Sequence, residues 1–90
     1  MYPKIREIRV LQEYHLAVRF ENNIVKVLDF IDLIKEPRFD PLKDELLFSS
    51  VQIDKGAYGI SWNDDIDMSE YELWQLGKEM PELELETNWN

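Results

Sequence analysis

Residues 15–29, HLAVRFENNIVKVLD, decide the fold. Every second position from Leu16 to Phe20 is apolar, which indicates a strand that buries one face. The run 24–29 is rich in β-branched residues and is typical of a second strand. Asn22 and Asn23 stand between the two runs, and asparagine tolerates the left-handed backbone that tight hairpin turns need. The segment therefore predicts a β-hairpin.

The residues before this hairpin predict a third strand. Ile8 and Val10 alternate with polar residues over 6–11, whereas Ile5 is out of phase with them. Because one extra residue in a strand produces such a change of phase, we expect a β-bulge or the start of the strand at Ile5. The three strands together form an antiparallel meander, with basic side chains interleaved on its more exposed face.

Helical segments follow the meander. Residues 30–34 predict a short helical turn that ends before Pro37. Asp40 and Pro41 have the residue types of an N-cap and of a first helical position. The helix that they begin is expected to end near 48–50, and its apolar stripe consists of Leu42, Leu46 and Leu47.

A second pair of strands comes next. Val51 and Ile53 alternate with polar neighbours, Gly56 lies in a turn, and residues 58–62 return the chain beside the first strand. The large rings here and in the following helix are expected to pack in the core, or to anchor an interface with an acidic rim. These rings belong to Tyr58, Trp62, Tyr71 and Trp74.

A final helix completes the predicted domain. Ser69 and Glu72 have the spacing of a capping box, and Gly77 is a suitable helix stop. The sequence therefore predicts one α+β domain over 1–77, made of an antiparallel three-stranded meander, a helix, two further strands and a C-terminal helix. Residues 78–90 are expected to be an acidic tail, either a short edge strand or a segment that orders on binding.

Length and composition restrict the class of protein. The chain has 90 residues, 44% hydrophobic and 32% charged, which is typical of one globular domain. It has no cysteine, so disulfides, thiolate metal sites and thiol nucleophiles are excluded. No apolar run approaches the about 20 residues of a membrane span, and the first residues do not resemble a signal peptide. We therefore expect a cytoplasmic protein without membrane contact.

The negative charge is concentrated in the last third of the chain. The formal net charge is −9, of which residues 63–90 carry −8, with nine acids and one base. Such a field repels nucleic-acid phosphates and anionic lipids, and it attracts a basic protein partner. Direct nucleic-acid binding is therefore not expected. The plainer alternative is that these acids only keep a small protein in solution.

Few residues suit catalysis or metal binding. His15 has no evident acid or serine partner along the sequence, so we interpret it as a surface strand residue. The acids of 63–70 suggest a divalent cation, but Met68 stands where a calcium loop needs glycine and Trp74 where it needs glutamate. Turn formation and helix capping explain these acids more simply. No catalytic residue, metal ligand or cofactor is therefore assigned, and a weak carboxylate- or metal-dependent enzyme is the least favoured alternative.

Partner-binding residues are proposed in two groups. The first group is the acidic set around the last predicted turn, Asp64, Asp65, Asp67 and Glu70. In the second group, acids alternate with leucines in the tail, and one tryptophan follows that has little core to join. This group consists of Glu82, Glu84, Glu86 and Trp89. Strand alternation with one charged face suits a partner's sheet edge.

Three motifs occur in order along residues 3–76. The first is a hairpin that leads from a phenylalanine to an aspartate. The second is a proline-leucine helix that contains an aspartate and ends in phenylalanine, and the third is a tryptophan followed by an aspartate and a leucine-bearing helix. Their members are Phe20, Asp29, Pro41, Leu42, Asp44, Phe48, Trp62, Asp67 and Leu73. In this order and spacing, the chain resembles a family of small, mostly bacterial proteins of unknown function, DUF2442.

The resemblance implies the same α+β fold and a role as an antitoxin-like partner of another small protein. Some members of the family carry an added helix-turn-helix, for which there is no room here after residue 76, so DNA binding does not carry over. The family supplies no catalytic residues to transfer. Asn23 and Asp65 stand where glycine is usual in the family, which weakens any role tied to the second turn.

Two hypotheses of different classes follow. The first is a non-enzymatic module that binds a basic protein through its acidic C-terminal third, in its most concrete form an antitoxin-like inhibitor. The second is a homo-oligomeric regulatory or scaffold domain, in which the exposed hairpin strand or the tail at Leu83 and Leu85 pairs across a two-fold axis.

Overall fold

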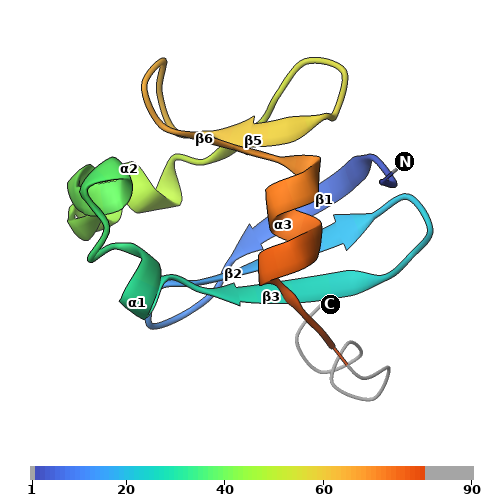
Figure 1. Cartoon of the computed structure of the whole chain (residues 1–90), viewed down its shortest axis with the longest axis horizontal. Coiled ribbons are helices and arrows are strands. Elements are labelled where there is room, and N and C mark those ends of the chain that lie inside the picture. Colours follow the sequence, from blue (N-terminus) through green and yellow to red (C-terminus); the bar gives the residue numbers. More distant parts are fainter. Residues whose placement is uncertain (1, 81–90) are drawn as a thin grey trace.

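Two antiparallel sheets enclose the core, with helices at one end and along one side (Figure 1). The structure is a computed structural model and describes residues 2–80. The larger sheet has the strand order β1-β2-β3-β7. Its strands are β1 (Ile5–Val10), β2 (His15–Phe20), β3 (Val25–Asp29) and β7 (Lys78–Glu79). The predicted α+β class and three-stranded meander are confirmed.

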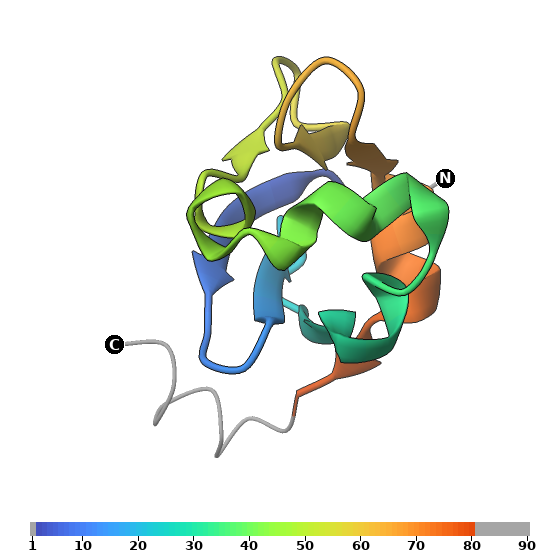
Figure 2. The same ribbon diagram turned by 90° about the vertical axis from the view of Figure 1, so that its left-hand side faces the viewer.

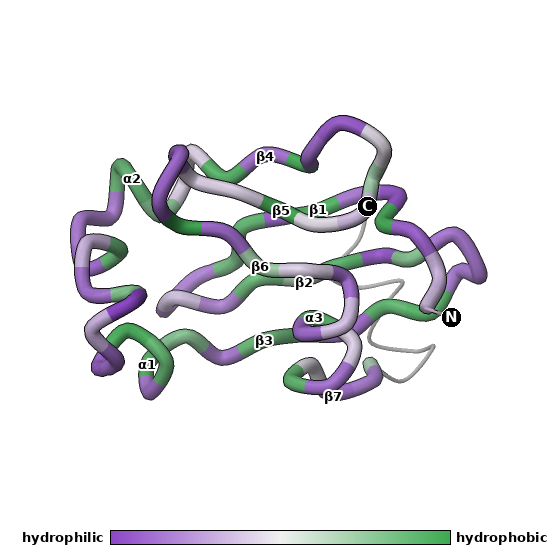
Figure 3. Tube along the Cα trace, turned by 45° about the horizontal axis from the view of Figure 1, so that its top comes forward, coloured by the Kyte–Doolittle hydropathy of each residue, from purple (hydrophilic) through white to green (hydrophobic). Residues whose placement is uncertain are grey.

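The central hairpin forms as predicted. Leu16 pairs with Leu28, and both are fully buried, so the two strands direct one apolar face to the core. Asn23 has a φ of 69°, the left-handed conformation expected for this turn. The pairing of β1 with β2 shifts between Ile5 and Glu7, which confirms the predicted irregularity. Figure 3 shows hydrophobic and hydrophilic positions alternating along these strands.

The face of the meander with the basic side chains, which was predicted to be the more exposed one, is buried at its centre. Ala17 is only 1% exposed, although it lies outside the main core cluster. In the strand register it stands between Arg9 and Val27. The longer side chains on both sides can shield a single methyl group.

The smaller sheet has three strands in the order β4-β5-β6, which are β4 (Gln52–Ile53), β5 (Gly59–Ser61) and β6 (Asp67–Ser69). The sequence predicted the first two strands but not β6. This strand has only three residues, of which Met68 alone is buried, so it has too little alternation to be recognised. Position 59 requires glycine because the neighbouring strand is close: a Cβ there would lie 2.5 Å from the carbonyl oxygen of Met68.

The helical segment of the chain that connects the two sheets differs from its prediction. Helix α1 (Phe30–Leu33) forms as expected, and it is followed by a 3₁₀ helix, η1 (Pro37–Lys43), and by α2 (Glu45–Ser49). The predicted helix start at Asp40 and Pro41 is therefore wrong, because both residues lie inside η1. The true N-cap of α2 is Asp44, whose carboxylate accepts hydrogen bonds from the next helical amides.

The later helix start also changes which leucines are buried. Leu42 is fully buried from η1, but Leu46 is 85% exposed, so the predicted apolar stripe of one continuous helix is wrong there. Because α2 begins at Glu45, its inward position falls on Phe48, which is 3% exposed. Asp44, with extended backbone, separates the 3₁₀ helix from α2, so a single 3.6-residue periodicity does not apply across them.

The last helix, α3 (Glu70–Leu76), has the predicted capping box between Ser69 and Glu72. It ends at Gly77, as predicted, but with a φ of −76°, so left-handed backbone is not the reason for glycine. A Cβ at Gly77 would lie 2.7 Å from the Cβ of Lys26. The ammonium of Lys26 donates to the carbonyl oxygen of Trp74 at 2.7 Å, where a cation is favoured by the helix dipole.

Four aromatic rings form the centre of the core. Phe30 lies 5.3 Å from Phe48 and 5.7 Å from Trp62, and the ring of Phe39 lies 6.0 Å from Phe30 and 6.4 Å from Trp62. The indole N–H of Trp62 donates to the carbonyl oxygen of Phe48 at 2.9 Å, so its polar atom is satisfied inside the core. Among residues 2–80, no helix is long and apolar enough to cross a membrane.

Candidate interaction surfaces

The acidic loop, residues 63–67, projects two carboxylates into solvent. The side-chain oxygen of Asn63 accepts hydrogen bonds of 2.9 Å from the amides of Asp65 and Ile66, and the amide of Trp62 donates to the Ile66 carbonyl oxygen. These bonds fix the loop without the side chains of Asp64 and Asp65, which are exposed. Within the described part of the chain, neither carboxylate takes part in an ion pair.

The other two acids of the predicted set lie apart from this pair. Asp67 is exposed on β6, and Glu70 is half-buried as the first residue of α3. Over residues 2–80, no group of three or more histidines and carboxylates converges as metal ligands would. The structure therefore does not bring Asp64, Asp65, Asp67 and Glu70 together as one cation site.

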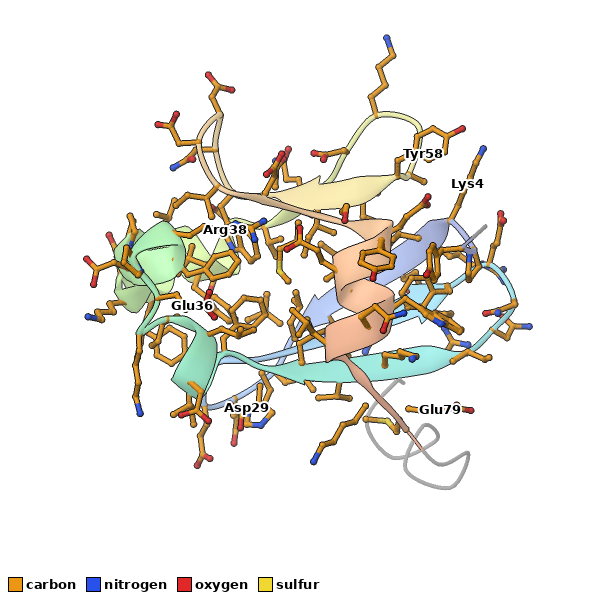
Figure 4. The ribbon with its side chains drawn as sticks, viewed as in Figure 1. Lys4, Asp29, Glu36, Arg38, Tyr58 and Glu79 are labelled. Atoms are coloured by element: carbon orange, nitrogen blue, oxygen red, sulfur yellow. The ribbon has the colours of Figure 1, made fainter. Side chains whose placement is uncertain are left out.

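An ion pair missed by the sequence holds α3 against η1. Arg38, which is labelled in Figure 4, donates from both terminal nitrogens to the carboxylate of Glu72, at 2.7 and 3.0 Å. It also donates to the carbonyl oxygen of Asp67. The hydrogen bond from Arg38 lowers the pKa of Glu72, while the same bond raises the pKa of Arg38. Arg38 and Glu72 are far apart in sequence, so no local pattern predicts their ion pair.

Most motif residues support the fold. Five apolar members are buried in the core: Phe20, Leu42, Phe48, Trp62 and Leu73. Two acidic members are helix N-caps. Asp29 accepts from the amide of Ile31 at 2.9 Å, and Asp44 accepts from the amide of Leu46 at 3.0 Å. Pro41 lies within η1, and Asp67 is exposed on β6. Most of the motif residues thus belong to the core or are helix N-caps.

Comparison with known families agrees with this architecture. A family model described as "Protein of unknown function (DUF2442)" matches residues 5–79. The chain belongs to the DUF2442 family. The matched span runs from β1 to β7, so both sheets and all helices described above lie within the family domain. No curated protein and no solved structure matches the chain.

The DUF2442 domain includes the beginning of the predicted tail. Lys78 and Glu79 form β7, which pairs with β3, and the amide of Met80 donates to the carbonyl oxygen of Val25. The edge-strand alternative therefore holds for residues 78–79. The proposed contact residues Glu82, Glu84, Glu86 and Trp89 lie outside the described residues, as do Leu83 and Leu85.

His15 holds a turn. Its Nδ1 lies 3.0 Å from the carbonyl oxygen of Glu13 and 3.2 Å from that of Gln12, while Nε2 lies 3.7 Å from the Asp29 carboxylate. A cavity of about 400 Å³ lies beside it, with side chains of both charge signs in its lining, including Asp29 and Lys78. The contacts of His15 are those of a residue that fixes a turn.

Three tyrosines form a second surface, the tyrosine cluster, made of half-buried Tyr2 and exposed Tyr58 and Tyr71. Tyr58 is 58% and Tyr71 is 53% exposed, and the Tyr2 and Tyr71 rings lie 5.0 Å apart, edge to face. The ammonium of Lys4 lies 4.9 Å from the centre of the Tyr58 ring (Figure 4). Trp62, in contrast, is a core residue. Of the two expectations for the large rings, core packing applies to Trp62, while Tyr58 and Tyr71 remain available for an interface.

Proposed function

We propose that this DUF2442 protein is a non-enzymatic binding module that engages a basic protein partner through its acidic C-terminal third. An antitoxin-like inhibitor of a small basic protein is the most concrete form. The observation that carries the proposal is the division of the acids. Asp29 and Asp44 cap helices, whereas Asp64 and Asp65 are exposed on a fixed loop and have no partner among the described residues.

The arrangement of the loop supports electrostatic recognition. Two adjacent carboxylates on an ordered loop keep their position without a counter-ion, so a partner's lysine or arginine meets a pre-formed charge. Complementary charge of this kind speeds association and is screened by salt. The proposal therefore expects affinity to fall steeply as ionic strength rises.

A pull-down from the native host's lysate at low salt tests the proposal. The baits are the full chain, a truncation after Met80, and the double variant Asp64→Asn/Asp65→Asn. Truncation after Met80 keeps β7 and so leaves the larger sheet intact. The matched control is Asp32→Asn, which removes an acid that is 87% exposed but paired with Lys35.

We expect the full chain and the control to retain a basic protein that is released by added salt. The double variant and the truncation should each retain less of it. The proposal is contradicted if the retained protein is acidic, or if its binding responds neither to salt nor to the loop and tail changes.

A homo-oligomeric regulatory or scaffold domain is the second candidate. It is favoured by large apolar side chains that remain exposed, such as Leu46 at 85% and Leu76 at 51%. The predicted docking strand of the hairpin is less suitable, because β7 covers β3 at Lys26 and Val27. Light scattering over a range of concentrations separates the two candidates, since a monomer at every concentration contradicts self-association.

A further inference from the structure

A small cavity lies between the turn that joins β1 to β2 and helix α2. Its volume is about 190 Å³, and its apolar wall is formed by Val10, Leu11 and Phe48. Glu13, Tyr14 and Glu45 provide polar lining. In Figure 2 the β1–β2 turn and α2 are at the end of the molecule that faces the viewer. The cavity thus combines an apolar wall with carboxylates.

The turn side of the cavity is held in place from within the fold. Glu13 and Tyr14 have φ values of 57° and 59°, which are unfavourable for residues other than glycine and asparagine. The Tyr14 hydroxyl donates to the carbonyl oxygen of Lys43 at 2.6 Å, and its ring lies 5.0 Å from that of Phe48. These contacts compensate for the backbone strain and keep this wall pre-formed.

Among residues 2–80, the charged side chains that line the cavity have one sign. The charged residues in its lining are Glu13 and Glu45, both exposed. The nearby ammonium of Lys43 lies 2.6 Å from the carboxylate of Asp40, so its charge is already paired. Burial raises the pKa of Tyr14, and the negative charges of Glu45 and Asp44 raise it further.

We propose that this cavity binds a lysine side chain of the basic partner, so the inference rests on the proposed function and adds a second contact to it. The four-carbon stem of lysine packs against Val10, Leu11 and Phe48, and the ammonium lies between the carboxylates of Glu13 and Glu45. Lysine suits this combination because it carries a compact charge at the end of an apolar stem. An apolar side chain would gain no attraction from the two carboxylates.

The lysine site can be tested without the partner. The full chain, labelled with ¹⁵N, is titrated with N-acetyl-lysine methylamide, and amide shifts are followed by NMR. The neutral analogue N-acetyl-norleucine methylamide has a similar stem without the charge. We expect the lysine compound to shift the amides of residues 10–14 and 45–49, and to bind at least about twofold more tightly than the neutral one.

Two variants identify the carboxylates. Glu45→Gln keeps the shape of the side chain and removes one charge, and it should weaken binding of the lysine compound about two- to fivefold. The control is Glu21→Gln in the β2–β3 turn, at the opposite end of the meander, where binding should not change. Because Glu45 is exposed, the variant is expected to keep the spectrum of the folded protein.

Each outcome decides the inference. Equal binding of the charged and neutral compounds, shifts centred on residues 63–67, or an unchanged affinity in Glu45→Gln would each overturn it. Those results would leave the proposed function standing, because the pull-down and its salt dependence test that function separately. Conversely, a lysine-specific response in the cavity would remain if the acidic loop proved unnecessary for the partner.

Discussion

The motif acids and the loop acids of this protein have the same chemistry and different surroundings. Asp29 and Asp44 each accept hydrogen bonds from the first amides of a helix. Asp64 and Asp65 are exposed on a loop that is closed by Asn63, and in the described residues their carboxylates bond to nothing. Whether an acid stabilises the fold or only adds surface charge therefore depends on which backbone amides lie near its carboxylate.

The same contrast separates the family motif from the charge. The motif residues are mainly core side chains and helix caps, so the family match reports which sequences can adopt this fold. The two exposed acids of the acidic loop, Asp64 and Asp65, lie outside the core. Variants of the motif residues should therefore lower stability, whereas variants of the loop acids should weaken binding and leave stability unchanged.

The largest loss of stability is expected from Trp62→Ala. Trp62 contacts three phenylalanine rings and donates a hydrogen bond to the carbonyl oxygen of Phe48. Its removal should lower the free energy of unfolding by about 3–5 kcal/mol, measured by urea denaturation with circular dichroism. A loss below about 1 kcal/mol would contradict the assignment of this motif residue to the core.

The next effect tests which acid caps α2. Asp44→Ala removes the acceptor for the amides of Leu46 and Leu47 and should lower the free energy of unfolding by about 1 kcal/mol. The matched control is Asp40→Ala, the N-cap that the sequence suggested, with an expected loss below about 0.5 kcal/mol. If Asp40→Ala proved the more harmful in urea denaturation, the helix start observed here would be wrong.

A smaller effect follows from the ion pair between Arg38 and Glu72. Because the folded state lowers the pKa of Glu72 below its ordinary value of 4.5, folding is favoured by the ionised carboxylate. This contribution is present above pH 4.5 and is lost as the pH falls through the lower, folded-state pKa. Glu72→Gln keeps the capping-box geometry and should lose about 0.5–1 kcal/mol at pH 7.

Urea denaturation at a series of pH values measures this contribution. The difference in unfolding free energy between the wild type and Glu72→Gln should shrink between pH 4.5 and the acid end of the series. A difference that stayed constant over this range would show that the charge of Glu72 does not stabilise the fold.

The smallest effect on stability is expected from Asp64→Asn/Asp65→Asn. Both side chains lack hydrogen bonds in the described residues, so the free energy of unfolding should change by less than about 0.5 kcal/mol. A gain is compatible with relief of like-charge repulsion. A loss above about 1 kcal/mol, again by urea denaturation, would place these acids with the structural ones and remove the contrast.

The meander was predictable from the sequence because alternation over 15–20 and the turn at Asn23 act locally. The capping box of Ser69 and Glu72 was predictable for the same reason. Strand β6 was not, since its pairing depends on Ile60 lying opposite Met68, which no local pattern encodes. The start of α2 was misplaced because Asp40 and Asp44 are each followed by acceptable helical residues, and only the packing of Leu42 and Phe48 selects between them.

The candidate surfaces were predictable only in part. Charge counts located the acidic loop, and the structure adds that Asn63 fixes its shape. The cavity beside α2 needs residues 10–14 and 45–49 to meet in space, so sequence position alone gives no sign of it. The Arg38 and Glu72 pair was invisible for the same reason.

The late position of β7 in the chain has a consequence for biosynthesis. A ribosome releases β3 well before Lys78 and Glu79, the residues that pair with it. Until they emerge, the amide and carbonyl groups along one side of β3 have no strand to bond, and an open edge of this kind can recruit another chain. The nascent protein is therefore exposed to aggregation in the interval between the completion of its hairpin and the emergence of β7.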